Sequence, residues 1–152
     1  MSIFLFVTIN LINLFAILFF VSKFRWPSIE HLLGAVTLLL AIPAAIIGIL
    51  NLMEGRWLFT WLPALLYVVW AAFDLVVDHV VRVEFRNPFR PSIGIPFLLL
   101  YYFSIGGMAA SLYSVNIYLW IISGVTCLLN VYASFYSASH GRGNLIQLKR
   151  KA

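Results

Sequence analysis

The chain has 152 residues, of which 63% are hydrophobic and only 10% are charged, and its mean hydropathy is +1.01. Soluble domains average roughly 45–50% apolar and about 25% charged residues, and one core of this size cannot bury so much apolar surface. The composition therefore excludes a soluble globular domain and predicts a single-domain, all-α polytopic integral membrane protein. The formal charge of +5 is attributed to membrane topology and not to nucleic-acid binding. Cys127 is the only cysteine in the sequence, so we expect no intrachain disulfide.

The hydrophobic pattern predicts a bundle of five transmembrane helices, because a span requires about 20 mainly apolar residues. The first segment has no Lys or Arg before Lys23, so it lacks the basic region of a signal peptide and is expected to be a span. Ser28 is the expected N-cap of the second span, and a tight turn at residues 113–116 separates the last two. The predicted spans are residues 3–22, 29–53, 57–81, 93–113 and 116–137, followed by a basic tail at 138–152.

The distribution of Lys and Arg predicts the orientation of these spans. Nine basic residues follow the first, third and fifth spans, whereas Arg56 alone follows the second. The positive-inside rule then places the N-terminus outside and the C-terminus in the cytoplasm of a multi-pass plasma-membrane protein. The nine residues are Lys23, Arg25, Arg82, Arg86, Arg90, Arg142, Lys149, Arg150 and Lys151.

Small residues four positions apart predict close helix contacts in the second and fourth spans, because small side chains let helix backbones approach. Pro43 and Pro63 lie inside the second and third spans and are expected to kink them. The small-residue pairs are Ala41 with Ala45, Ala44 with Gly48, Gly106 with Ala110, and Gly107 with Ser111.

Two carboxylates inside the third span are the strongest functional signal. Asp74 and Asp78 lie one helical turn apart on one face. An acid at membrane depth is costly and normally faces a protein interior, a cavity or a partner charge. Other polar side chains gather in the same, cytoplasmic half of the predicted bundle. The candidate ligand-binding residues are Asp74, Asp78, His79, Arg82, Tyr102, Asn130 and Tyr136, with Asp74 and Asp78 as candidate metal ligands.

One interpretation of this cluster is purely structural. In it, Asp78 pairs with Arg82 one turn later, and Asp74 hydrogen-bonds to Asn130 or to a tyrosine. The leading functional hypothesis is instead the binding or translocation of a small ligand, an ion or a lipid head group. Two neighbouring carboxylates raise one another's pKa, so they are suited to share a proton or to hold a cation.

Two further functional hypotheses involve metals. In an enzyme that acts on a phosphorylated lipid or isoprenoid, the two aspartates would hold Mg²⁺ or another divalent cation, and the following arginines would neutralise the phosphate. Alternatively, His31, His79 and His140 would complete a transition-metal site with the carboxylates. The sequence contains no H-E-x-x-H, G-x-S-x-G, Cys-x-x-Cys or phosphate-binding Gly loop, so whether the chain is an enzyme stays open.

The expected partners follow from the same pattern. Membrane lipids surround the spans, and a small-molecule, ion or lipid ligand would occupy the polar site. An accessory subunit of a membrane complex, or a homo-oligomer, also fits a chain with few residues outside its spans. No nucleic-acid partner is expected.

Overall fold

The computed structural model describes residues 2–81 and 90–140, apart from the side chains of residues 24, 27, 78–80, 139 and 140. The regular structure of these residues is entirely helical. Five helical segments are long and apolar enough to cross a membrane, which confirms the prediction of an all-α chain with five such segments. They are Ser2–Lys23, Glu30–Met53, Leu58–Leu75, Pro91–Ser114 and Ile117–Ala138.

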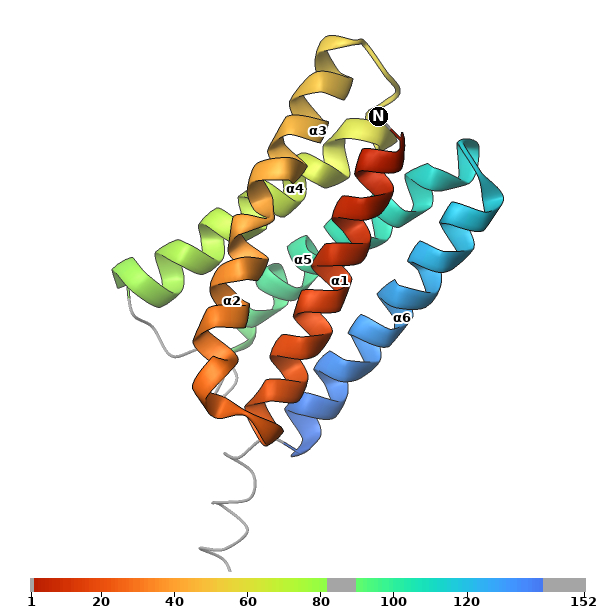
Figure 1. The fold of residues 1–152 in the computed structure, drawn as a ribbon. Helices are drawn as coiled ribbons and strands as arrows, with labels where there is room; N and C mark the ends of the chain where they lie inside the picture. The colour runs from red at the N-terminus through yellow and green to blue at the C-terminus, as the bar shows by residue number, and fades with distance from the viewer. Residues whose placement is uncertain (1, 82–89, 141–152) are drawn as a thin grey trace, which may run out of the picture.

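The helices form one bundle with α1 (Ser2–Arg25) between α2 (Glu30–Leu39) and α6 (Ile117–His140) (Figure 1). Helix α3 (Ala41–Met53) packs against α4 (Leu58–Leu75), which makes its largest contact with α5 (Pro91–Ser111). Helix α6 lies at the edge and packs against α1 and α5. Three short elements complete the described chain: the 3₁₀-helices Pro27–Ile29 and Leu112–Ser114, and the π-helix Val76–Val81.

The second predicted span is two helices, interrupted at Leu40. Pro43 has no N–H to donate to the carbonyl of Leu39, and its ring crowds that carbonyl. Hydrogen bonds with the ordinary α-helical spacing of four residues flank the interruption, from the Leu40 N–H to the Val36 carbonyl (3.1 Å) and from the Ala44 N–H to the Leu40 carbonyl (3.3 Å). The interruption falls where Pro43 was expected to disturb the second span, whereas α4 continues through Pro63 without interruption.

The predicted start of α2 is wrong, whereas the predicted turn before α6 is observed. Ser28 is not the N-cap of α2, because residues 27–29 enter the helix as a 3₁₀ turn and the cap position falls on Ile29, without a side-chain hydrogen bond. The expected turn before α6 is confirmed by the 3₁₀-helix Leu112–Ser114. Asn116 then caps α6, with its Oδ1 accepting hydrogen bonds from the N–H groups of Tyr118 (2.8 Å) and Leu119 (3.4 Å).

Two of the predicted small-residue contacts are present, and both are made to α4. A Cβ atom on Gly48 would lie 2.6 Å from Leu65, and one on Gly107 would lie 2.6 Å from the Pro63 ring. A Cβ on Gly106 would have no neighbour within 4 Å. Gly48 and Gly107 therefore allow α3 and α5 to approach α4 closely.

Candidate functional site

Asp74, the first carboxylate of the predicted site, lies near the end of α4. Tyr67, Trp70 and Asp74 follow one another at helical spacing, so all three project to the same side. Tyr67 and Trp70 are buried, and Asp74 is partly exposed. The Tyr67 hydroxyl donates a hydrogen bond of 2.8 Å to the Thr37 carbonyl, and the Trp70 ring lies 4.7 Å from the ring of Tyr101 on α5. Asp74 thus follows two buried aromatic residues on one face of α4 and is the most exposed of the three.

The helix changes its geometry directly after Asp74. Helix α4 ends at Leu75, and the backbone continues as the π-helix Val76–Val81. Helical backbone therefore continues to Val81, the predicted end of the third span, but the segment long and apolar enough to cross a membrane ends at Leu75. A π-helical segment packs its backbone less favourably than an α-helix and is found frequently at functional sites, so this segment is a structural sign that favours a site near Asp74.

Three of the predicted site residues cannot be placed in this geometry. Asp78 and His79 belong to the π-helix, but their side chains lie outside the described part of the structure, as does the whole of Arg82. The expected Asp78–Arg82 pair and a magnesium ion between Asp74 and Asp78 therefore stay predictions.

Asn130 lies at the centre of a hydrogen-bonded network that joins three helices. Its side chain is fully buried, and its Nδ2 donates to Asn13 Oδ1 on α1 (2.9 Å) and to the Tyr101 hydroxyl on α5 (2.7 Å). Asn13 Nδ2 in turn donates to Thr126 Oγ1 (3.1 Å). The network continues along α1 and α6 through Asn10, which accepts from Thr126 (2.8 Å) and donates to Ser123 (2.9 Å).

We call Asn10, Asn13, Tyr101, Ser123, Thr126 and Asn130 the polar seam. Asn10 and Asn13 were not predicted as site residues, because nothing local in the sequence shows that α1 lies beside α6. One signal could have found them: two polar side chains three residues apart on α1 match a polar row with spacings of three and four on α6. The register of these bonds also shows that α1 and α6 run parallel.

Two buried polar atoms flank Tyr101 without a hydrogen-bond partner among the described residues. They are Trp70 Nε1, a donor, and Asn130 Oδ1, an acceptor. A buried polar group without a partner costs about 1–3 kcal/mol. Trp70 and Asn130 each contact the Tyr101 side chain, so they supply an N–H donor and a carbonyl acceptor on either side of it, and Asp74 adds a carboxylate one turn after Trp70. Such a set can hold a cation or a small polar group that both donates and accepts hydrogen bonds.

Tyr102 and Tyr136, both predicted to bind a ligand, have other surroundings. The Tyr102 hydroxyl is hydrogen-bonded to the Ser134 hydroxyl on α6, and its ring stacks on Phe135 at 6.5 Å. Tyr136 is half-exposed, with its ring 6.1 Å from that of Tyr132. The tyrosine that the structure brings to Asn130 is Tyr101, which was not among the predicted ligands.

No described group of three or more His, Cys, Asp or Glu side chains is arranged to hold a metal ion. His31 is exposed on α2, and the side chains of His79 and His140 lie outside the described residues. The transition-metal hypothesis accordingly stays a prediction. In comparisons with known proteins, no family model, no curated protein and no solved structure matches this chain.

Proposed function

We propose that this chain is a membrane-embedded binding protein for a small cation or polar ligand, with a site that runs from Asp74 inward to Trp70 and Asn130. One observation carries the proposal. A buried donor and a buried acceptor have no partner among the described residues, and the donor lies one turn from a carboxylate inside a membrane span. Buried polar groups of a scaffold normally pair with one another, whereas a few converging polar groups within an apolar surround are typical of ligand sites.

The chemistry of the three groups defines the ligand class. Asp74 supplies the negative charge that attracts a cation or takes up a proton. Trp70 Nε1 would donate to a ligand oxygen, and Asn130 Oδ1 would accept from a ligand hydroxyl or amine. The rings of Tyr67 and Tyr101 contact the Trp70 ring, and these aromatic faces would add cation–π attraction for a positively charged ligand.

This proposal includes the orientation of the site toward the cytoplasm. Lys23, Arg25 and Arg90 lie at the end of the bundle where α1 and α4 end and α5 begins, which is the end nearer to Asp74. Arg56 lies at the other end. The positive-inside rule supports a cytoplasmic location for the basic end, with the N-terminus outside and the protein in the plasma membrane.

The test is a thermal-shift titration of the purified protein in detergent with Na⁺, K⁺ and Mg²⁺, and with pH between 5 and 8. A ligand that binds only the folded protein raises its stability, by about 2.7 kcal/mol at a hundred times its Kd. We expect Asp74→Asn to fold normally and to lose the response, because the amide keeps the size but has no charge.

Trp70→Phe provides the second arm of the experiment. Phenylalanine keeps the packing on Tyr101 but removes the indole N–H, so we expect stability without ligand to change little and ligand binding to weaken. Trp57→Phe, at the opposite end of the bundle, is the matched control and should respond as the unmodified protein does. If Asp74→Asn and Trp70→Phe both keep the full response to every cation and pH, the site proposed here is wrong.

The other hypotheses have no support from the described geometry. An enzyme acting on a phosphorylated lipid would depend on Asp78, Arg82 and Arg86, whose side chains lie outside the described residues. The hypothesis of an accessory subunit depends on a partner chain. Both stay predictions from the sequence.

A further inference from the structure

The turn between α3 and α4 holds Arg56 against the end of α3. Gly55 has a positive φ of 63°, which glycine adopts without steric cost. Its N–H donates to the Leu52 carbonyl (3.0 Å), and the Arg56 N–H donates to the Asn51 carbonyl (3.1 Å). This pair of hydrogen bonds is the Schellman motif that commonly ends helices.

The side chains in this motif depart from the usual pattern. The positions occupied here by Asn51 and Arg56 frequently make a hydrophobic contact that closes the turn. Both residues are polar in this chain, although Asn51 is only 3% exposed. Within the described residues, the hydrogen bond donated by Asn51 Nδ2 is a long one of 3.5 Å to the Thr60 carbonyl. An apolar pair would pack better at this position, so the polar pair points to a role other than packing.

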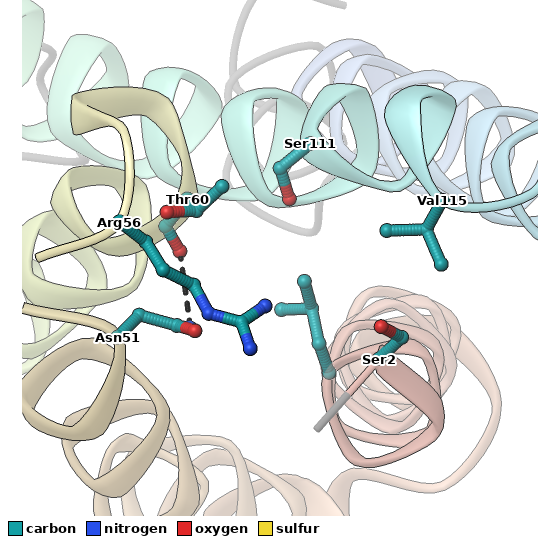
Figure 2. Close-up of a pocket in the computed structure, with 7 residues that line it drawn as sticks. Ser2, Asn51, Arg56, Thr60, Ser111 and Val115 are labelled. Carbon is teal, nitrogen blue, oxygen red and sulfur yellow. Dashed lines mark hydrogen bonds between the residues drawn. The ribbon is translucent and has the colours of Figure 1, made fainter. Parts of the chain in front are cut away.

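Both residues line a pocket at this end of the bundle. Figure 2 shows the Arg56 guanidinium extending between Asn51 and Thr60 on one side and Ser111 and Ser2 on the other. The free volume of the pocket is about 30 Å³, which exceeds the roughly 10–15 Å³ that one water requires. The pocket, which we call the Arg56 pocket, is lined by Ser2, Leu5, Asn51, Arg56, Thr60, Ser111 and Val115.

The polar groups of the Arg56 pocket that are not used in hydrogen bonds within the protein are the ones that can bind a ligand. Arg56 Nε donates to Glu54 Oε2 at 2.6 Å, and in the described part of the chain no partner is found for the other two guanidinium nitrogens. The Thr60 and Ser111 hydroxyls donate to the carbonyls of Trp57 (2.6 Å) and Met108 (2.8 Å), so their oxygens are available as acceptors. The pocket therefore presents a cationic two-nitrogen edge beside neutral acceptors.

We propose that the Arg56 pocket binds a phosphate group, as carried by a phospholipid head group at this surface of the membrane. A guanidinium edge matches two phosphate oxygens, and charge-assisted bonds of this kind are about twice as strong as neutral ones. The hydroxyl oxygens of Thr60 and Ser111 accept from head-group hydroxyls. Exposed Trp57, Tyr113 and Tyr118 surround this end of the bundle, and such aromatic residues mark the depth at which head groups lie.

This site is independent of the Asp74 site, because it lies at the other end of the bundle. The experiment measures binding to the purified full-length protein in detergent by native mass spectrometry and by thermal shift. The probes are dihexanoyl phosphatidylglycerol, inorganic phosphate and, as the phosphate-free control, a short-chain diacylglycerol. We expect the phospholipid to bind and the diacylglycerol not to bind.

Two neighbouring substitutions should act in opposite directions. Arg56→Gln removes the guanidinium and should weaken phospholipid binding about tenfold or more, the factor that one hydrogen bond to a charged group contributes. Glu54→Gln removes the carboxylate that competes for the guanidinium and should strengthen binding. Arg90→Gln, an arginine substitution at the opposite end of the bundle, should leave binding unchanged.

Each result bears on the proposal. If inorganic phosphate alone binds as tightly as the phospholipid, the phosphate site is supported and its ligand is soluble. Arg56→Lys keeps the charge without the two-nitrogen edge, so a loss of several-fold is expected; it supplies the test if Arg56→Gln does not fold. Equal binding of diacylglycerol and phospholipid, or effects of equal sign for Arg56→Gln and Glu54→Gln, would overturn the proposal.

Discussion

Single residues of the polar seam contribute specificity to a bundle whose buried core is mainly apolar. Asn13 and Asn130 are both fully buried, and each bonds to residues of a different helix. Apolar contacts between helices differ little from contacts with lipid, so they select helix partners poorly. The directed chain of donors and acceptors between α1 and α6 fixes which faces of these helices meet.

A double-mutant cycle on Asn13 and Asn130 tests this role. Each change to alanine leaves a buried polar partner unpaired, so we expect each to lower the free energy of unfolding by about 1–2 kcal/mol. The coupling energy should lie near about 0.6 kcal/mol, the average measured for hydrogen bonds between membrane helices, and should not exceed the maximum of about 1.7 kcal/mol. Denaturation of the protein in mixed micelles provides the measurement.

A control cycle uses Asn13 and Ser111, which share no hydrogen bond and lie at different depths of the bundle. Their effects should add, because distant substitutions without common partners are independent. A coupling of zero between Asn13 and Asn130 would show that their bond contributes nothing to the pairing of α1 with α6.

Among single residues, Asp74 could be recognised from the sequence, but the hydrogen-bond partners of Asn130 could not. Asp74 is conspicuous because its cost at membrane depth is a property of one residue and its immediate sequence. The partners of Asn130 depend instead on which helices are neighbours, because Asn13 and Tyr101 lie 117 and 29 positions away in the sequence. Asn10 and Asn13 were therefore overlooked, and Tyr101 was passed over in favour of its neighbour Tyr102.

Whole elements were predicted more reliably than contacts between them. The five spans agree with the observed helices to within a few residues at most ends, because the length of an apolar run is local information. The interruption at Leu40 followed from one proline. The π-helix after Asp74 was not foreseen, since no simple sequence pattern marks the change from α to π geometry.

Adjacent glycines on α5 offer a matched test of helix contact. Gly107→Ala would place its Cβ against the rigid ring of Pro63 on α4, so we expect a loss of about 1–3 kcal/mol from overpacking. Gly106→Ala meets open space and should be neutral or stabilise the helix by up to about 1 kcal/mol. Thermal unfolding of both variants in the same detergent measures the difference. Equal stabilities would mean that α5 does not approach α4 closely at Gly107.

At the scale of the whole molecule, orientation in the membrane can be tested by cysteine labelling. With Cys127→Ala as background, cysteines at the exposed positions Glu54 and Ser114 should react with an impermeant maleimide on intact cells. Cysteines at the exposed positions Ser28 and Ser92 should react only after permeabilisation, because the basic end is expected in the cytoplasm. The reverse pattern would place the Asp74 site toward the outside and the Arg56 pocket toward the cytoplasm.

The pairing of α1 with α6 has a consequence for how the protein is made. Asn13 and Asn130 are 117 residues apart, and a ribosome adds about 5–20 residues per second. Asn13 is therefore synthesised roughly 6–23 s before its partner. During that interval its amide must be accommodated by the insertion machinery, by lipid head groups or by temporary contacts with the helices already made. A nascent chain stalled before α6 is therefore expected to leave uncovered the face of α1 that α6 packs against.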